Sequence, residues 1–234
     1  DHHEVPGALP GASALVNTNR PDCAFPFKDL AGVGIVFNFL IALRSSLKTE
    51  GFWSSRPFPN LKEYLDLVAL GTIGDISPLV GENRIFTKVG LELINRGSRT
   101  GIKALMSACG LGSSLDSIVA SFTLIPRINA AGRIASPDDS IKLLLTDNAS
   151  EAAGIARKLD AYNRERQGLE KEILSEALSE IENGKGHSQT PAIILSSDKW
   201  HPGVIGIVAS KLVDLYYRPV ILVSIKNGVG KGSG

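Results

Sequence analysis

The stretch that decides the fold class lies near the end of the chain: AIILSSDKWHPGVIGIVASKLVDLYYRPVILVSI, residues 192–225. Residues 192–195 form an apolar run typical of a buried strand, residues 204–215 follow a helical pattern, and residues 220–225 are again strand-like. A strand, a helix and a strand in succession favour a parallel pair of strands. The sequence therefore predicts an α/β fold.

A long helix is expected before this stretch. Residues 148–183 carry apolar residues at helical spacing, with Glu, Lys and Arg at many of the other positions. At 1.5 Å per residue such a helix is roughly 50 Å long, which is typical of a helix that joins two domains. Residues 183–188, NGKGHS, contain glycines that are expected to end it.

The earlier part of the chain is expected to hold a short strand and several helices. Residues 12–17 are interpreted as a short buried strand, and residues 32–48 as an amphipathic helix. Asn60 is an expected helix N-cap, with Glu63 as its capping-box partner. Residues 51–59 are rich in Gly, Ser, Pro and aromatic residues and are expected at the surface.

The composition is that of a globular protein, with 43% hydrophobic and 21% charged residues, which excludes disordered and collagen-like classes. No apolar run reaches the roughly 18 to 20 residues that a membrane span needs, so no membrane association is expected. Cys23 and Cys109 lie far apart without metal-ligand spacing, which suits a reducing compartment and predicts a cytoplasmic location. The net charge of +1 argues neither for nor against a nucleic-acid partner.

Basic residues nonetheless gather in one part of the sequence. A local cleft can be basic in a nearly neutral protein, although a solvated helix face would have the same pattern. These residues are Arg127, Arg133, Arg157, Lys158, Arg164 and Arg166.

The chain opens on Asp1-His2-His3, two adjacent imidazoles behind a carboxylate. The imidazoles offer neutral nitrogen ligands to a metal, and the carboxylate can orient them. A chain that opens on Asp instead of Met is expected to be a piece of a longer protein. By itself the triplet could equally be a remnant of a purification tag or a solvated terminus.

Three further places carry candidate chemistry. Asp75 lies among apolar residues after a Gly-flanked turn, where an aspartate is usually a turn cap. Arg127 and Arg133 could each bind phosphate oxygens, although arginines at a turn are common. His201 directly precedes an expected helix, so its imidazole and the NH groups of that helix could face an anion; a surface histidine is the other reading.

Taken together and in order, these motifs closely resemble the RecJ single-strand exonucleases of the DHH phosphoesterase superfamily. The resemblance runs over nearly the whole chain and is more specific than Asp-His-His alone. It is carried by residues 1–22 and by DLVALGTIGD at 66–75, PRINAAGR at 126–133 and WHPGVIGIVA at 200–209.

The resemblance implies a centre with two Mn²⁺ or Mg²⁺ ions. His2 and Asp75 would be metal ligands, His3 would meet the substrate phosphate or the attacking water, and Asp1 would orient the pair. The first two aspartate motifs of the family lie upstream of Asp-His-His and are not in this sequence. These 234 residues alone are therefore expected to bind Mn²⁺ weakly and to be inactive.

The same resemblance implies contacts with the DNA backbone. Residues 126–133 would line the mouth of the cleft, with Arg127, Asn129 and Arg133 as phosphate ligands. His201 would contact substrate from the DHH-associated domain. Residues 230–234 are similar to the start of the family's Gly-Lys-Gly-Ser-Gly-Arg-Ser phosphate loop, which adds Lys231 and Ser233.

The fold class that follows is α/β: an incomplete DHH phosphoesterase domain with a parallel sheet, a connecting helix, and the start of a smaller α/β domain. The expected bounds are 1–146 for the first domain, 147–184 for the connection and 190–234 for the start of the DHH-associated domain. The two domains are not expected to share one sheet.

The implied function is metal-dependent 5′ to 3′ hydrolysis of single-stranded DNA in repair and recombination, with a single-strand binding protein and a helicase as candidate partners. Two alternatives stay open. One is a DHH phosphodiesterase for short oligonucleotides or cyclic dinucleotides, and the other is a non-catalytic nucleic-acid-binding relative. The presence of His2, His3 and Asp75 argues against the second.

Overall fold

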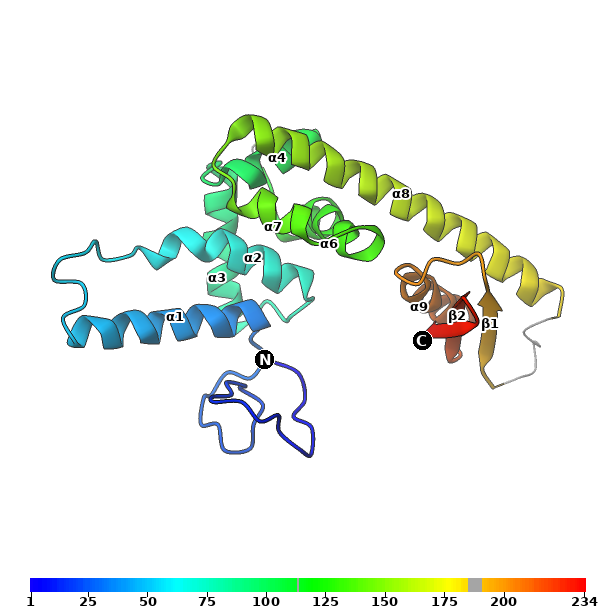
Figure 1. Ribbon diagram of the computed structural model, residues 1–234, viewed down its shortest axis with the longest axis horizontal. Helices are drawn as coiled ribbons and strands as arrows, with labels where there is room; N and C mark the ends of the chain where they lie inside the picture. Colours follow the sequence, from blue (N-terminus) through cyan, green and yellow to red (C-terminus); the bar gives the residue numbers. More distant parts are fainter. Residues whose placement is uncertain (113, 185–190) are drawn as a thin grey trace. The chain divides into compact units, whose positions relative to one another are not determined.

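The computed structural model describes residues 1–112, 114–184 and 191–234 (Figure 1). The helices in chain order are α1 (Gly32–Thr49), the 3₁₀ helix η1 (Leu61–Tyr64), α2 (Leu65–Gly74), α3 (Gly81–Asn95), α4 (Thr100–Ala108), α5 (Ser117–Phe122), α6 (Leu124–Ile134), α7 (Asp138–Leu145), α8 (Ala149–Glu182) and α9 (Ile205–Tyr216). The strands are β1 (Ile193–Ser197), β2 (Val220–Lys226) and β3 (Val229–Ser233).

The chain divides into two compact units. The first comprises Asp1–Ile125 and Thr146–Ala152, and the second comprises Pro126–Leu145 and Ala153–Gly234. The start of α8 therefore belongs to the first unit and the rest of it to the second. The second unit also takes α6 from Pro126 onward and all of α7, which the expected division after residue 146 assigns to the first domain.

The first unit is built around α2, which is apolar on all sides and mostly buried. On one side, Leu65 and Val68 pack with Phe37 of α1, whose ring meets Phe86 of α3 edge to face. On another side α3 crosses at Gly90, where a Cβ would lie 2.1 Å from the carbonyl oxygen of Leu65. Only a residue without a side chain fits there.

The start of α2 is held by a buried ion pair. Asp66 is almost fully buried, and the Arg99 guanidinium donates to both of its carboxylate oxygens, over 2.7 Å from Nε and 3.1 Å from Nη2. Bidentate pairing of this kind fixes direction as well as distance. It therefore locks the beginning of α2 to the segment that leads into α4.

The expected helices are confirmed in the first unit, with one difference in detail. The helix expected over residues 32–48 is α1. Asn60 caps the next one, since its Oδ1 accepts from the Lys62 amide. Glu63, however, accepts from the Asn60 side chain instead of its backbone NH, and the first turn is 3₁₀. The capping interaction is thus a variant of the expected box.

The strand expected at residues 12–17 is wrong. The described part of the first unit contains no strand, and residues 14–17 have no regular structure. The carbonyl of Leu15 accepts from the Arg20 side chain, so it bonds outside a strand ladder. The parallel sheet expected in this part is likewise not seen among the described residues.

The second unit confirms the strand-helix-strand prediction. Strands β1 and β2 are parallel, with Ile193 opposite Val220, and α9 connects them. Its core gathers apolar residues of β1, α9 and β2 against Ile173 and Ala177 of α8. Trp200 is fully buried in this core, and its Nε1 donates to Glu176 over 2.9 Å, which ties the loop after β1 to α8.

Strand β3 was not expected, because residues 230–234 were interpreted as the start of a phosphate loop. It pairs antiparallel with β2 through a hairpin whose turn residues, Asn227 and Gly228, both have positive φ. Asn-Gly is the commonest pair in such two-residue turns, so the signal was present in the sequence.

The long helix expected over 148–183 is confirmed as α8, which ends at Glu182 and is followed by Gly184 at positive φ. Residues 185–188 of the expected terminating segment lie outside the described residues. Within the ranges that the structure describes, no helix combines the length and the apolar character needed to cross a bilayer.

Replacing Gly90 by Ala should destabilise the first unit by about 3 kcal/mol or more, because the new methyl group would overlap the Leu65 carbonyl and force α2 and α3 apart. Thermal unfolding measures the change. Gly154 is the matched control, since it also lies in a helix but nothing approaches its Cβ position. Gly154→Ala should stabilise by about 0.5–1 kcal/mol. Equal behaviour of the two variants would contradict the packing argument.

Candidate metal and phosphate sites

Two asparagines hold the Asp1-His2-His3 segment in place. Asn19 donates to the carbonyl of His2 over 2.8 Å, and Asn17 donates to the carbonyl of His3 over 3.0 Å. Asn17 is buried, and its side-chain oxygen accepts from the Asn19 amide over 2.8 Å. Neither asparagine is among the site residues that the sequence predicts, and Asn17 stands at the end of the expected strand. Their Asn-x-Asn spacing was the sequence signal that both side chains could bind the same backbone segment.

The Asp1 carboxylate organises the two histidines that follow it. One of its oxygens accepts from the backbone NH groups of His2 and His3, over 2.8 and 3.2 Å, and lies 2.7 Å from Nδ1 of His3. Because a carboxylate can only accept, this contact favours the tautomer of His3 with its proton on Nδ1. The Nε2 atom of His3 is then the acceptor nitrogen, on an imidazole that is largely exposed.

His2 and Asp75 meet although they are far apart in the sequence. Nδ1 of His2 lies 3.5 Å from a carboxylate oxygen of Asp75, and the rings of His2 and His3 are 4.5 Å apart between centroids. The first turn of α1 packs beside them, since a Cβ on Gly32 would lie 3.5 Å from the His2 ring. The structure thus brings together His2, His3 and Asp75, the residues that the family resemblance implies around one metal centre.

The end of α2 determines where the Asp75 carboxylate points. Asp75 is the C-terminal cap residue of α2, and Ser77 donates its hydroxyl to the carboxylate over 2.7 Å. Between them, Ile76 has φ of 57°, a left-handed conformation that is unfavourable for a β-branched residue. This turn reverses the chain immediately after the carboxylate.

The donors present are suitable for a metal but incomplete. Imidazole nitrogen and carboxylate oxygen are both ligands of Mn²⁺, and both side chains are partly exposed. In the part of the chain that the structure describes, no three His, Cys, Asp or Glu side chains form a group that could hold a metal ion. His2 and Asp75 thus offer part of a coordination shell.

In the second unit, Arg127 is paired inside the protein. Its Nε donates to Asp160 of α8 over 2.8 Å, and the other Asp160 oxygen accepts from Arg164 over 2.6 Å. The Asp160 side chain is only 10% exposed, so this pair anchors α6 on α8. Arg127 has a structural task in addition to the predicted contact with phosphate.

Arg133, His201 and Ser233 gather near the start of α9. Arg133 Nη1 lies 3.4 Å from the Gly203 carbonyl oxygen, and His201 Nδ1 accepts from the Gly203 amide over 3.1 Å. A Cβ on Gly203 would be 2.0 Å from the Arg133 carbonyl oxygen, so the end of α6 rests directly on this loop.

Strand β3 brings further polar groups to the same place. A Cβ on Gly206, in the first turn of α9, would lie 2.8 Å from the Ser233 hydroxyl. Lys231 is two residues earlier and therefore on the same face of β3. On α6, Asn129 is exposed and lies one turn before Arg133. Cations and donors near a helix N-terminus are suited to an anion.

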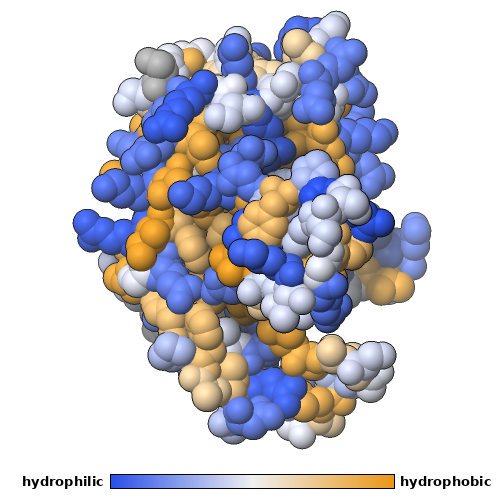
Figure 2. Space-filling view, turned by 90° about the vertical axis from the view of Figure 1, so that its left-hand side faces the viewer, coloured by the Kyte–Doolittle hydropathy of each residue, from blue (hydrophilic) through white to orange (hydrophobic). Residues whose placement is uncertain are grey.

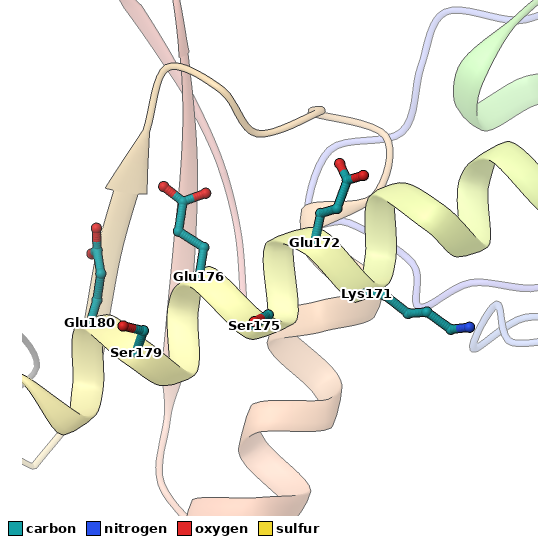
Figure 3. A pocket seen from close by; sticks show the side chains of 6 residues that line it. All are labelled: Lys171, Glu172, Ser175, Glu176, Ser179 and Glu180. Carbon is teal, nitrogen blue, oxygen red and sulfur yellow. The ribbon is translucent and has the colours of Figure 1, made fainter.

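A separate groove of about 580 Å³ runs along α8, but its charge is wrong for a phosphate (Figure 3). Glu172, Glu176 and Glu180 point to one side of the helix, and Lys171 points away from them. Glu176 is moreover the acceptor of the Trp200 indole. Three carboxylates along one helix face repel a polyanion, so this groove is not a candidate DNA site.

Comparison with known proteins shows what the chain is similar to. No family model matches it. It is 41% identical over 237 residues to the single-stranded-DNA-specific exonuclease RecJ of Bacillus subtilis, covering 100% of this chain and 28% of the relative. It is 42% identical over 241 residues to RecJ of Escherichia coli, covering 100% and 42%. Along its whole length, the chain matches RecJ.

Solved RecJ structures agree with the sequence match. RecJ of Thermus thermophilus in complex with Mn²⁺ superposes with a TM-score of 0.78 at 36% identity, over 94% of this chain and 31% of that one. The complex with Mg²⁺ gives a TM-score of 0.72 over 87% and 30%. The α/β class is confirmed, and the chain spans well under half the length of these RecJ proteins.

An ion pair in the second unit predicts a pH dependence of stability. The ammonium of Lys158, 2.8 Å away, holds the pKa of the Asp139 carboxyl below its usual range, with a smaller contribution from the Tyr162 hydroxyl. A depressed folded-state pKa adds stability above the unfolded pKa, and this stability is lost as the pH falls through the folded value.

The Asp139→Asn variant should therefore be less stable than the parent at neutral pH, and this difference should shrink as the pH falls from about 4 through the depressed pKa of Asp139. Thermal unfolding between neutral and acid pH measures this difference. Asp198→Asn is a control on an exposed carboxylate. A difference between the Asp139→Asn variant and the parent that persists unchanged into acid would contradict the ion-pair account.

Proposed function

We propose that the protein is a metal-dependent exonuclease that hydrolyses phosphodiester bonds of single-stranded DNA from the 5′ end, in DNA repair and recombination. The observation that carries the proposal is the approach of His2 to Asp75 beside His3 in a chain that matches RecJ along its whole length. The names of those relatives, single-stranded-DNA-specific exonucleases, supply the substrate.

In this proposal His2 and Asp75 are ligands of a divalent metal, Mn²⁺ or Mg²⁺, the two ions found in the Thermus thermophilus RecJ complexes. A pair of such ions supplies an activated water and neutralises charge on the reacting phosphate. Two protein donors leave most positions of two ions open, so these residues alone should bind Mn²⁺ weakly and cleave DNA negligibly.

His3 acts on the reacting groups, and Asp1 positions it. His3 presents Nε2 to the substrate phosphate or to the attacking water, because Asp1 occupies its Nδ1 side. Asp1 is thereby a positioning residue, since it also fixes the backbone of both histidines. Ser77 has the corresponding role for the Asp75 carboxylate.

The second unit would bind the DNA backbone. Arg133, His201, Lys231 and Ser233 supply cations and donors near the N-terminus of α9, and Asn129 extends this group along α6. A contact of Arg127 with phosphate has to share the guanidinium with Asp160. The group is suited to hold the strand while the first unit carries the metal ligands.

The remaining assignments follow from the same proposal. Residues 1–146 belong to the catalytic DHH domain, 147–184 connect, and 190–234 begin the DHH-associated domain. The enzyme acts in the cytoplasm, away from membranes, with a single-strand binding protein and a helicase as partners. A DHH phosphodiesterase for short oligonucleotides or cyclic dinucleotides is distinguished by its preference for short over long substrates.

Replacing Asp75 by Ala in the full-length protein should lower Mn²⁺-dependent cleavage of single-stranded DNA by at least about 100-fold and weaken Mn²⁺ binding in calorimetry, because a ligand is removed. Glu92→Ala removes an exposed carboxylate in the first unit that pairs only weakly with Arg96, and it should leave both unchanged. Normal degradation of single strands by the Asp75→Ala enzyme would refute the metal role.

Replacing Arg133 by Gln, or His201 by Gln, should weaken DNA binding while chemistry on bound substrate is retained. The loss of one phosphate contact from Arg133 should also reduce the slope of log affinity against log salt by roughly 0.7. Arg96→Gln is the control, since this exposed arginine lies outside the proposed binding group. The assignment fails if Arg133→Gln changes turnover of bound substrate and leaves affinity and salt slope as they were.

A further inference from the structure

Residues 44–58 at the far end of α1 form a cluster of aromatic rings and cations that none of the roles above uses. We define the aromatic platform as Phe52, Trp53 and Phe58 together with Arg44, Lys48 and Arg56. Phe52 and Trp53 meet edge to face with centroids 4.8 Å apart, and Trp53 meets Phe58 in the same way at 6.0 Å.

Hydrogen bonds hold the loop of the aromatic platform in place. Trp53 Nε1 donates to the carbonyl of Arg44 over 3.1 Å, and Arg44 donates to the carbonyl of Pro59 over 2.8 Å. These two bonds fasten both sides of the loop to the last turns of α1. The rings are thus held in place before any ligand arrives, which lowers the entropy lost on binding.

The cations of the platform lie on the rings. The Arg56 guanidinium is 4.1 Å from the centroid of Phe52, and Arg44 and Lys48 lie 4.8 and 5.7 Å from that of Phe58. Among residues 1–112, 114–184 and 191–234, no carboxylate forms an ion pair with any of the three. Their positive charge is therefore not neutralised within the described protein.

The rings remain accessible. Phe58 is 50% and Phe52 41% exposed, which is high for aromatic residues held by several contacts. Figure 2 views the molecule from the side on which this loop lies in Figure 1, and hydrophobic and hydrophilic surface alternate there. Half-exposed rings beside unneutralised cations match a ligand with flat apolar faces and regularly spaced negative charges.

We propose that the aromatic platform is a binding site for single-stranded nucleic acid, in which bases stack on Phe52 and Phe58 while Arg44, Lys48 and Arg56 contact phosphates. Base stacking on aromatic side chains, with cations tracking the backbone, is how proteins hold single strands without reading their sequence. The inference rests on the proposed function and adds a second contact for the same substrate.

The distance to the candidate metal site sets the length of strand that is needed. The N-terminal end of α1 packs beside His2, and Lys48 lies sixteen residues further along this helix. At about 1.5 Å per residue the separation is about 24 Å. A stacked strand rises about 3.4 Å per nucleotide, so about 7 nucleotides would connect the two places.

The test is equilibrium binding of fluorescent oligothymidines to the full-length protein without divalent metal. Phe58→Ala should weaken binding of an oligonucleotide of about 20 nucleotides by about tenfold and leave binding of one of about 4 nucleotides unchanged. Lys48→Gln should reduce the salt slope for the long oligonucleotide by roughly 0.7. Phe58→Tyr, which keeps a stacking ring, should bind like the parent.

Matched controls separate stacking from general effects. Phe122→Ala removes a phenylalanine that is 79% exposed on α5, and Lys103→Gln removes an exposed lysine of α4. Both should bind as the parent does. Phe58→Leu keeps an apolar side chain without a ring and should bind as weakly as Phe58→Ala. Parental binding of the long strand by Phe58→Leu or Phe58→Ala overturns the proposal, as does an equal loss on both lengths.

Two further measurements test whether the ligand is a protein instead of a nucleic acid, and whether the proposed function holds independently of the platform. If the platform variants lose binding of an acidic peptide that carries phenylalanine and keep binding of the long strand, the ligand is a protein and the assignment is wrong. Asp75→Ala is measured in parallel. If that variant still cleaves while Phe58→Ala loses long-strand affinity, the metal role of Asp75 fails and the platform stands. If the full-length parent cleaves no single strands while Phe58→Ala loses long-strand affinity, the proposed function fails and the platform stands.

Discussion

The close approach of α3 to α2 at Gly90 is the constraint on which the first unit depends. A helix that is apolar on all sides must be surrounded, and α3 can come near enough only where no side chain intervenes. The same helix is fixed at its start by the pairing of Asp66 with Arg99 and ends in the turn at Ile76. Because α3 contacts α2 along its length, the ion pair fixes its start and the turn ends it, the position of the Asp75 carboxylate is largely determined.

The elements that local pattern dictates were predictable from the sequence. The helix at 32–48, the Asn60 cap, the long helix and the parallel pair of strands each have a period, a cap or a turn that acts within a few residues. The segment at 12–17 has an apolar pattern but no neighbouring strand among the described residues, and the carbonyl of Leu15 accepts from the Arg20 side chain instead. Hydropathy does not reveal whether a partner strand is present.

The candidate site was predictable only in part, because proximity of distant residues has no local signal. The meeting of His2 and Asp75 followed from resemblance to a family, and residue chemistry alone would have left Asp75 as a turn cap. Arg127 and Arg133 look equivalent in the sequence. In the structure Arg127 donates to Asp160, whereas Arg133 donates to the carbonyl of Gly203. The acidic partner on another helix decides this difference.

Each compact unit carries one of the two tryptophans of the chain. Trp53 is partly exposed among other aromatic rings of the first unit, whereas Trp200 is fully buried in the second, with its indole bonded to Glu176. The two indoles therefore emit from different surroundings, one partly hydrated and one dry. Intrinsic fluorescence can in this way follow the two units separately, and quenching by a dissolved reagent reaches the first indole well before the second.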